Sequence, residues 1–494
     1  MPVPSELADR RIALLLFLTL HFLYLLTSSG RVHTMDEVTV DYQVESLATK
    51  GSTAIPQAAA EGYFYGKRDQ FGQPQGAYGP GNAALIVPWY WVGRLAGAVL
   101  PGIPKIAGTM FRDAFLVASS AAFSAAAAAF LYLLLRKKRV TESAAFFAAT
   151  LLALATPMFS YSSWFFSEPL AAALLLGGLS LVFGVEESEE IPVRDAAFGG
   201  LLLGVLVCVR MTHAIALPVV AIGMLLRRGG AKRNLRAALA LCIVSGVFCA
   251  LYLLRNYYLF GNPLDVGYPQ FAEGGKNVMG FGTPLLKGLW MLLFSPGKSL
   301  FVFAPPLLLA IPGLFALARK DRGLALTTVG ISLAYLFFYA KYSYLEGGYS
   351  YGPRYLVPVI ALLCLGLGPM LEKSRQWVKP LAVATFVAGI FVNVTGMATN
   401  FMEDMTHGKY YDANFVYRTD YSPIGSMLAR FWHYATMQEP AALGHGFDRW
   451  FVFLTKTGVA RGLIVSALLI ELFGVIFFAW RLARVWKVTA HESN

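Results

Sequence analysis

Two adjacent carboxylates follow the first apolar stretch of the chain, at the point where the polypeptide leaves a run of hydrophobic residues. They are Asp36 and Glu37, in the sequence His33–Thr–Met–Asp–Glu37. A carboxylate held at the dry boundary of a membrane can accept a proton from a hydroxyl or an amine, because burial and nearby charges tune its basicity. Asp36 is therefore a candidate general base.

The residues after this doublet predict the helix that positions it. Residues 38–50 read as helical and Gly51 ends the helix. One face starts at Asp36 and continues through the apolar residues Val40, Val44 and Leu47 at helical spacing. If that face rests on protein or lipid, Asp36 is carried inward. A separate ridge is expected to stay in water, and it consists of Glu37, Asp41 and Glu45.

A structural interpretation of the doublet stays open beside the catalytic one. Thr34 and Glu37 have the spacing of a capping box, in which each side chain binds the backbone N–H of the other residue. Asp36, in the first turn, also suits the positive end of the helix dipole. On these residues alone, both interpretations fit.

Composition defines the broad class. Of 494 residues, 56% are hydrophobic and only 14% are charged, and long apolar stretches recur from end to end. This pattern predicts an all-α polytopic membrane protein with about 12 transmembrane helices. The net charge of +12 falls in clusters between apolar stretches, so it does not indicate nucleic-acid binding. The four cysteines lie inside apolar runs and form neither a disulfide framework nor a metal motif.

Basic clusters set the predicted topology. They follow apolar runs at residues 136–139, 227–236, 319–320, 373–375 and 481–487, and the positive-inside rule places them in the cytoplasm. An uncleaved first span, residues 12–26, and an interfacial helix, residues 82–99, keep the alternation consistent. Both termini are then cytoplasmic. Two short spans in residues 196–226 flank Arg210–Met–Thr–His213.

The loops place the working surface on the non-cytoplasmic side, because the long loops are outside and the inner turns are short. We predict a transmembrane catalytic module at residues 1–399, with outer loops at 28–111 and 260–298. An outer C-terminal loop region at 400–461 and a last span with a cytoplasmic tail at 462–494 complete the chain. The sequence contains no glycine-rich loop that would cradle a phosphate on the inner side, so nucleotide use is not expected.

An Asp–Glu pair after the first span, an interfacial helix and a second span with a basic end together resemble the GT-C glycosyltransferases. The most similar members are the protein O-mannosyltransferases and the aminoarabinose and galacturonic acid transferases of lipid A. The resemblance covers most of residues 10–370. No Trp–Trp–Asp signature is present, which disfavours an oligosaccharyltransferase.

The resemblance implies a GT-C-like bundle with juxtamembrane helices and loops on the outer face. It implies an inverting transferase that moves a sugar, hexose or pentose, from a polyprenyl-phosphate carrier to an acceptor on that face. The first acid of the doublet is the family's proposed base, which carries over to Asp36, with Glu37 beside it. The basic hinge around Arg210 and His213 also resembles one in the family.

Such a reaction leaves negative charge on a phosphate, so cations must meet it at the outer boundary. The candidates are Arg354, in Tyr–Gly–Pro–Arg354, Lys298, in Ser–Pro–Gly–Lys298, and the loop residues Lys67 and Arg68. Arginine suits bidentate phosphate binding better than lysine. The alternative is that these cations anchor span ends at lipid headgroups.

Aromatic and acidic residues near the same span ends complete the predicted cavity for sugar or acceptor. They are Tyr65, Tyr78, Glu168, Tyr349 and Tyr351. The tyrosines equally suit an interfacial aromatic belt. Arg210 is expected to tie two half-spans together instead of touching substrate.

The expected partners are membrane lipid, a polyprenyl-phosphate sugar and an acceptor that is a protein, a glycolipid or a polysaccharide. No cofactor and no essential divalent metal are expected, since two cations can meet the phosphate. The expected location is a bacterial inner membrane, with the site periplasmic. Two other functions stay open: a secondary transporter or lipid-sugar flippase, and a non-catalytic assembly subunit.

Overall fold

The computed structural model describes residues 4–100, 103, 108–268, 272–273, 276–277, 280–372, 376–403, 422–437 and 445–492. Within these ranges the chain is predominantly helical. Its strands form two short antiparallel hairpins, β1 (Gly66–Arg68) with β2 (Pro74–Gly76) and β3 (Ala272–Glu273) with β4 (Lys276–Asn277). The all-α prediction is confirmed.

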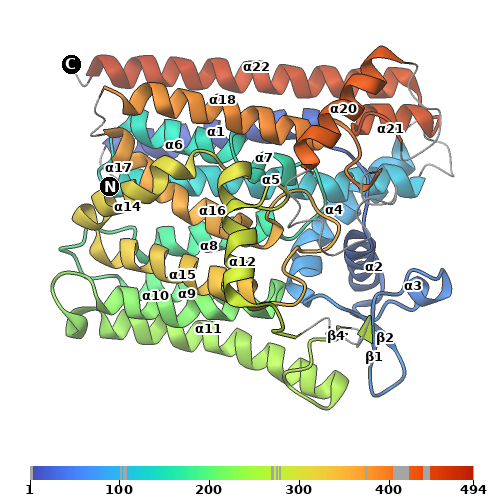
Figure 1. Ribbon diagram of the computed structural model, residues 1–494, viewed down its shortest axis with the longest axis horizontal. Helices are drawn as coiled ribbons and strands as arrows, with labels where there is room; N and C mark the ends of the chain where they lie inside the picture. Colours follow the sequence, from blue (N-terminus) through green and yellow to red (C-terminus); the bar gives the residue numbers. More distant parts are fainter. Residues whose placement is uncertain are drawn as a thin grey trace.

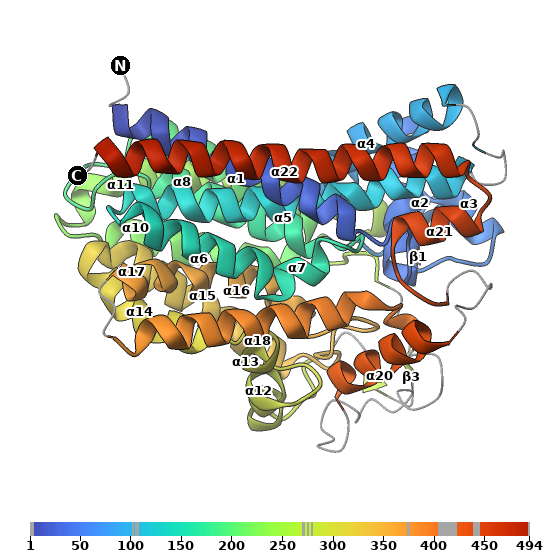
Figure 2. The ribbon, with the colours of Figure 1, turned by 90° about the horizontal axis from the view of Figure 1, so that it is seen from above.

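Most helices lie along one common axis, as Figures 1 and 2 show. The first half of this bundle contains α1 (Pro4–Thr27), α5 (Gly108–Lys137), α6 (Glu142–Leu154), α7 (Pro157–Tyr161), α8 (Glu168–Val182), α9 (Val193–Val209), η2 (Met211–Ile215), α10 (Ala216–Leu225) and α11 (Ala231–Phe260). The second half contains α13 (Leu300–Phe303), α14 (Leu307–Lys320), α15 (Arg322–Lys341), η3 (Arg354–Leu356), α16 (Val357–Leu363), η4 (Cys364–Gly366), α17 (Leu367–Glu372), α18 (Val378–Ala398) and α22 (Arg461–Glu492).

Seven helical stretches in the described ranges are long and apolar enough to cross a membrane. They are α1, α5, α11, α15, the run Arg354–Glu372, α18 and α22. Four shorter apolar helices of 10–17 residues accompany them, among them α8, which is buried along almost its whole length. A polytopic helical membrane protein is therefore confirmed, whereas the expected count of about 12 spans is not.

In the described ranges, six further helices do not belong to the bundle of parallel helices given above. They are α2 (Met35–Lys50), α3 (Pro56–Ala60), α4 (Pro80–Val99), α12 (Leu285–Phe294), α20 (Pro423–Thr436) and α21 (Trp450–Lys456). The predicted loop 260–298 thus contains a helix, α12, which crosses the direction of the bundle in Figure 1 and packs on α15. At ten residues, α12 is too short to span a membrane.

Helix α2 is the element that carries the acid doublet, and it forms as predicted. The capping box of Thr34 and Glu37 is present, and Gly51 ends the helix with a left-handed φ of 63°. Val40 and Val44 are buried, and α2 packs against α4. The prediction of a wet ridge is wrong, because Glu37 and Asp41 are both buried. Distant segments of the chain cover them.

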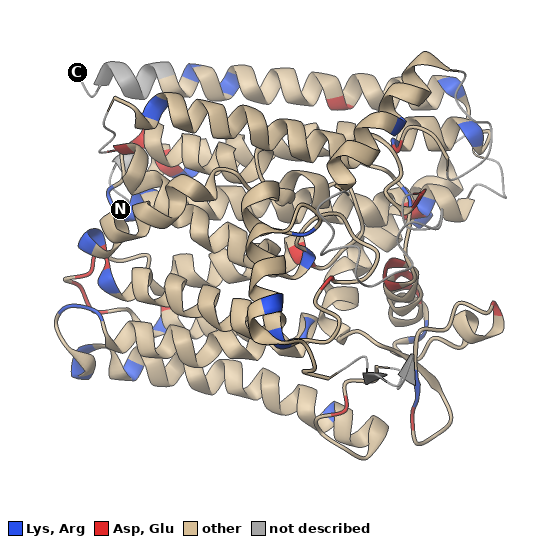
Figure 3. Ribbon diagram, in the orientation of Figure 1, with Lys and Arg blue, Asp and Glu red and all other residues tan. Residues whose placement is uncertain are grey.

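The two ends of the bundle are chemically different. Charged residues lie mainly toward the ends in Figure 3, and both termini lie at the same end in Figures 1 and 2. At that end, the basic residues after α5 and α10 meet acids: Lys138 and Arg227 both pair with Asp321, at the start of α15. The segment 342–353, which follows the other end of α15, leads to the candidate site.

Candidate active site

The carboxylate of Asp36 lies in the first turn of α2 and faces a cation. Its Oδ2 is 2.5 Å from Nη1 of Arg354, although 318 residues separate the two in sequence. The Asp36 side chain keeps 29% of its surface exposed, whereas that of Arg354 keeps only 4%. A small cavity is bounded by both residues together with Val40, Tyr78, Asn82, Phe165, Phe166, Ser167 and Val209. The doublet's first acid is thus held beside a cation and reachable from a cavity.

Arg354 is fixed from several sides at the start of η3. Its Nε donates to Oε1 of Glu168 at 2.9 Å, and its Nη1 also donates to the carbonyl oxygen of Gly347 at 3.2 Å. The guanidinium carbon lies 4.2 Å from the ring centroid of Phe166. These contacts orient a planar cation with its charge shared between two carboxylates, Asp36 and Glu168.

Glu168 links Arg354 to a second arginine. Nη2 of Arg210 lies 3.4 Å from the same Oε1 atom, and the other carboxylate oxygen, Oε2, is buried with no hydrogen-bond partner. The resulting series, Asp36–Arg354–Glu168–Arg210, alternates in sign. The two guanidinium groups therefore meet on one oxygen atom.

Arg210 sits where the helix α9 gives way to the 3-10 turn η2, as the sequence predicted for a broken pair of short helices. Its guanidinium carbon lies 5.2 Å from the ring centroid of Tyr355. His213, three residues later, is buried and its Nδ1 is 2.7 Å from the hydroxyl of Tyr335. The histidine thus packs inside the bundle, whereas the arginine reaches a cavity.

That cavity has a volume of about 470 Å³, and its wall is mostly apolar with many aromatic side chains. Its aromatic lining consists of Tyr78, Tyr252, Tyr268, Phe281, Phe338, Tyr339, Tyr342 and Tyr355. Among the described residues of this wall, Arg210 is the charged one, and Tyr78 and Val209 also border the small cavity at Asp36. A space of this size and polarity suits an apolar chain that ends in an anionic group.

Glu37, the second acid, has a structural role. Its Oε2 accepts hydrogen bonds from the backbone N–H groups of His33, at 2.5 Å, and Thr34, at 2.9 Å. Its Oε1 accepts the backbone N–H of Phe165 at 2.8 Å. Because the side chain is 0% exposed and bound at both oxygens, Glu37 fixes α2 instead of facing either cavity.

The other predicted cations pair with groups other than Asp36. Lys298 is 1% exposed and its Nζ donates to the carbonyl and hydroxyl oxygens of Ser350. Burial lowers the pKa of Lys298 to about 7, despite the opposing effect of Glu346. Lys67 pairs with Asp265 at 2.5 Å, and Arg68 donates to the carbonyl of Gly72. These contacts fix loops around the site.

The predicted tyrosines divide into two groups. Tyr65 and Tyr78 lie together, with ring centroids 6.3 Å apart, and each also contacts Tyr268. Burial, and next the charge of Asp36, raise the pKa of Tyr65 and of Tyr78, so both hydroxyls stay protonated. Tyr351 is buried and donates to the carbonyl of Val392 at 2.7 Å, and Tyr349 is 40% exposed. Neither lines the two cavities.

Sequence reasoning did not assign Arg210, Tyr268 or Tyr355 to the site. An arginine at a break between apolar helices is the signal that could have found Arg210, because charge within a membrane is costly and usually functional. The tyrosines carry no such signal, since they resemble an interfacial belt. Among the described residues, no three His, Cys, Asp or Glu side chains group as a metal site.

Comparison with known proteins gives one family match. The model of the Alg9-like mannosyltransferase family matches residues 114–409. No curated protein matches the chain.

Three solved structures are similar in fold. The apo form of ArnT from Cupriavidus metallidurans shares 16% identity over 94% of this chain and 74% of its own, with a TM-score of 0.49. The oligosaccharyltransferase AglB from Archaeoglobus fulgidus was solved in complex with an inhibitory peptide and a dolichol-phosphate. It shares 12% identity with this protein over 85% of this chain and 60% of its own, with a TM-score of 0.46. An Archaeoglobus fulgidus oligosaccharyltransferase tethered to an acceptor peptide shares 12% identity over 91% of this chain and 55% of its own, with a TM-score of 0.42. Because all three TM-scores are below 0.5, the family match carries the assignment.

Proposed function

The chain belongs to the Alg9-like mannosyltransferase family, a family of GT-C glycosyltransferases, and on this premise we propose a specific reaction for it. It is a membrane glycosyltransferase that takes a sugar from a polyprenyl-phosphate carrier and transfers it to an acceptor with inversion. Asp36 is the general base, and Arg354 and Arg210 hold the phosphate. The family assignment favours this reaction over a transporter, a flippase or an assembly subunit.

The donor phosphate is proposed to bind at the junction of the two cavities. Arg210 and Arg354 converge there on one oxygen of Glu168, so a phosphate can reach both guanidinium groups. Two arginines and two carboxylates leave a site of no net charge, so the phosphate competes with Asp36 and Glu168 for the bidentate hydrogen bonds of the guanidinium groups. The polyprenyl chain would occupy the aromatic cavity of about 470 Å³. This placement replaces Lys298, Lys67 and Arg68 with Arg210 as the second cation.

The chemical step is a single displacement. The acceptor oxygen or nitrogen attacks the anomeric carbon, its proton passes to Asp36, and the bond from that carbon to the phosphate oxygen breaks. The electron pair leaves on the phosphate, where the arginines stabilise the developing charge. A phosphate leaving group needs little protonation, so one carboxylate suffices. No divalent metal is required in this scheme, because the guanidinium groups carry out its electrostatic role.

The acid site is proposed to face the non-cytoplasmic side of a bacterial inner membrane. Lys138, Arg227 and both termini lie at the opposite end, and the positive-inside rule assigns that end to the cytoplasm. Cysteines introduced beside Asp36 and beside Asp321 would test this, with an impermeant maleimide added to intact spheroplasts. We expect only the cysteine beside Asp36 to be labelled. Labelling of only the cysteine beside Asp321 would show that the orientation is opposite to the one proposed.

One observation carries the proposal: a partly exposed carboxylate, Asp36, forms an ion pair of 2.5 Å with a buried arginine that borders a cavity. Purified protein would receive a panel of radiolabelled polyprenyl-phosphate sugars, mannose first, together with protein, glycolipid and polysaccharide acceptors. The variant Asp36→Asn is expected to lower kcat by roughly 10²- to 10⁴-fold, as loss of a general base does.

Glu45→Gln is the matched control, since Glu45 is on the same helix and 36% exposed. It should transfer sugar at the wild-type rate. Wild-type transfer by a folded Asp36→Asn protein would remove Asp36 as the base. Transfer with retained anomeric configuration would exclude the single displacement.

A further inference from the structure

A buried ion network holds the loop that precedes Asp36. Residues 28–34 join α1 to α2, and within them His33 places Nε2 at 3.0 Å from both carboxylate oxygens of Asp448. The other ring nitrogen, Nδ1, is 3.6 Å from Oε2 of Glu37. The three side chains are at most 1% exposed. One imidazole therefore lies between two buried carboxylates, one from each end of the chain.

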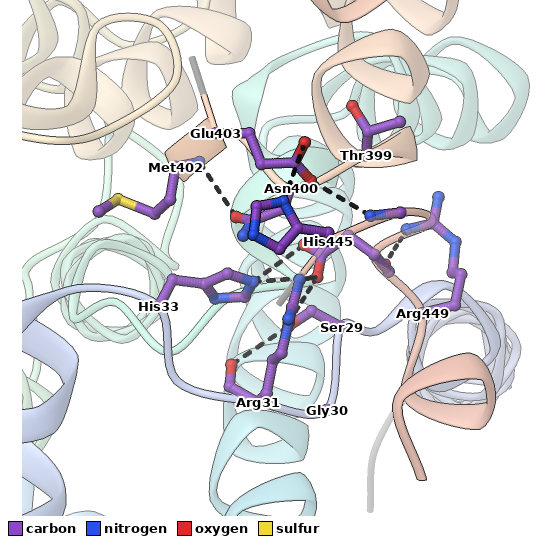
Figure 4. A network of polar contacts seen from close by, with 12 residues as sticks. Ser29, Gly30, Arg31, His33, Thr399, Asn400, Met402, Glu403, His445 and Arg449 are labelled. Carbon is purple, nitrogen blue, oxygen red and sulfur yellow. Dashed lines mark hydrogen bonds and ion pairs between the residues drawn. The ribbon is translucent and has the colours of Figure 1, made fainter. Parts of the chain in front are cut away.

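Further contacts tie the same two segments. Arg31 approaches Oδ1 of Asp448 with Nε at 2.9 Å and Nη2 at 2.8 Å. The backbone N–H of Trp450 donates to the carbonyl of Ser28 at 2.9 Å. A Cβ atom at Gly30, whose φ is +66°, would lie 2.3 Å from Cβ of Trp450, so only glycine fits there. Figure 4 shows Arg31 and His33 facing Arg449 and Glu403 across this junction.

The C-terminal segment is itself anchored to the bundle. The backbone N–H of Asp448 donates to the carbonyl of Ala398 at the end of α18, and Thr399 forms a β-bridge with Phe447. Arg449 donates through Nη1 to the carbonyl oxygens of Met397 and Asp448, each at 2.6 Å. Asp448 thus connects a fixed frame to the loop that carries the acid doublet.

Charge explains why this connection is strong. Burial lowers the pKa of His33, but Asp448 and then Glu37 raise it more, to about 9, so the ring is cationic at neutral pH. Arg449 faces Asp448 from the same segment and Arg31 faces it from the loop, and the ring of Phe401 packs on His33 with the ring centroids 5.4 Å apart. Without the proton on His33, Glu37 and Asp448 would lose the cation they share.

We propose that His33 and Asp448 are positioning residues for the catalytic acid. The pair clamps Glu37, the neighbour of Asp36, and so keeps the first turn of α2 where Asp36 meets Arg354. Residues 445–450, which lie beyond the family-matched range 114–409, thereby contribute to a site near the other end of the chain. The inference rests on the proposed role of Asp36 as base.

The test compares Asp448→Asn with wild-type protein in the transfer assay across pH. Because a misplacement of about 1 Å can cost ~100-fold in rate, kcat is expected to fall about 10- to 100-fold while the KM for the polyprenyl-phosphate sugar changes less than about 3-fold. Wild-type activity should fall as pH rises through about 9. In the variant this fall should move to lower pH, since the carboxylate that raises the pKa of His33 is gone.

Two further readouts separate positioning from mere folding. His33→Lys, which keeps a cation between the carboxylates, is expected to retain transfer and to move the alkaline fall in activity to higher pH. Hydrogen exchange of the α2 amides should speed up in Asp448→Asn and not in its control, Glu403→Gln. Glu403 belongs to the same junction but contacts Arg430, Tyr434 and Gly446. Wild-type kcat and an unchanged pH profile in Asp448→Asn would overturn the proposal.

Asp36→Asn, assayed beside these variants, distinguishes the two levels of failure. If Asp36→Asn is inactive and Asp448→Asn is normal, the role of Asp36 as base is supported and the positioning role of His33 and Asp448 is rejected. If Asp36→Asn is active, both the role of Asp36 as base and the positioning role of His33 and Asp448 are rejected. Should Asp448→Asn fail to fold, His33→Gln removes the same ion pair from the other side, and wild-type kcat in that variant would equally overturn the proposal.

Discussion

Two buried ion networks flank α15, and they differ in what surrounds the carboxylate. At the start of α15, Asp321 accepts the N–H of Leu324 at 2.9 Å and pairs with Lys138 at 2.6 Å and Arg227 at 3.3 Å. These three charged side chains are at most 2% exposed. The Asp321 network is buried, and its two cations also donate to carbonyl oxygens of residues 185 and 186.

Beyond the other end of α15, Asp36 has one cation, Arg354, and keeps 29% of its side chain exposed. Arg354 and Arg210 both border cavities, whereas none of the Asp321 network lines them. Buried charge alone thus does not mark an active site. The difference is a partly exposed carboxylate, Asp36, whose partner Arg354 is linked through Glu168 to an arginine on the wall of the cavity of about 470 Å³. Four variants test whether that difference decides function.

The largest effect on stability is expected from Asp321→Asn. It leaves Lys138 and Arg227 buried without their carboxylate, and breaking a buried ion pair in this way costs about 3–5 kcal/mol. Thermal unfolding in detergent would measure the loss. Protein that remains folded should bind polyprenyl phosphate with wild-type affinity. Selective loss of binding without loss of stability would erase the contrast between the two networks.

Arg354→Gln should have the largest effect on catalysis after Asp36→Asn. Removing one preorganised group that stabilises developing charge costs roughly 10²- to 10³-fold in kcat. Steady-state transfer and equilibrium binding of polyprenyl phosphate would be measured together, with Arg94→Gln as the control on the neighbouring helix α4. An Arg354→Gln protein with unchanged kcat and unchanged binding would leave this arginine as a structural residue only.

The sequence predicts the features that depend on neighbouring residues, and it does not predict contacts between residues far apart in the chain. The first span, the capping box of Thr34 and Glu37, the end of α2 at Gly51 and the break at Arg210 are local patterns, and all four are present. Asp36 and Arg354 were each singled out by residue type, but their pairing across 318 residues was not predictable.

The errors have the same origin. The ridge of α2 was expected in water, yet Arg112 covers Asp41 and the backbone of Phe165 covers Glu37. Both contacts come from distant segments that hydrophobic periodicity does not report. Asp448, whose partner His33 is 415 residues away, had no local motif at all.

Arg210→Gln is expected to weaken binding of the donor phosphate and to leave proton transfer to Asp36 unchanged. Loss of hydrogen bonds to a charged group costs about 1.5–3 kcal/mol, which corresponds to a roughly 10- to 100-fold weaker polyprenyl phosphate complex. Arg210→Lys should recover part of the affinity, because the charge returns without the bidentate geometry. Binding would be followed by microscale thermophoresis. If both variants bind as the wild type does, the cavity of about 470 Å³ is not the donor site.

Tyr268→Phe should have the smallest effect. Burial, offset by Arg210, raises the pKa of Tyr268, so its hydroxyl can donate one neutral hydrogen bond. Such a bond contributes about 0.5–1.5 kcal/mol, or up to roughly 10-fold in donor KM. Tyr268→Ala, which opens the aromatic wall, should cost more. Equal effects of Phe and Ala would show that the hydroxyl alone matters and that the wall does not hold the polyprenyl chain.

A cryo-electron microscopy map of the protein with polyprenyl phosphate would be the most direct measurement of the central claim. We expect the phosphate within about 3 Å of guanidinium nitrogens of both Arg354 and Arg210, with the chain along Tyr339 and Tyr355 and Asp36 facing the open side of the phosphate. A phosphate bound at Lys298 or Lys67, with the aromatic cavity empty, would contradict it.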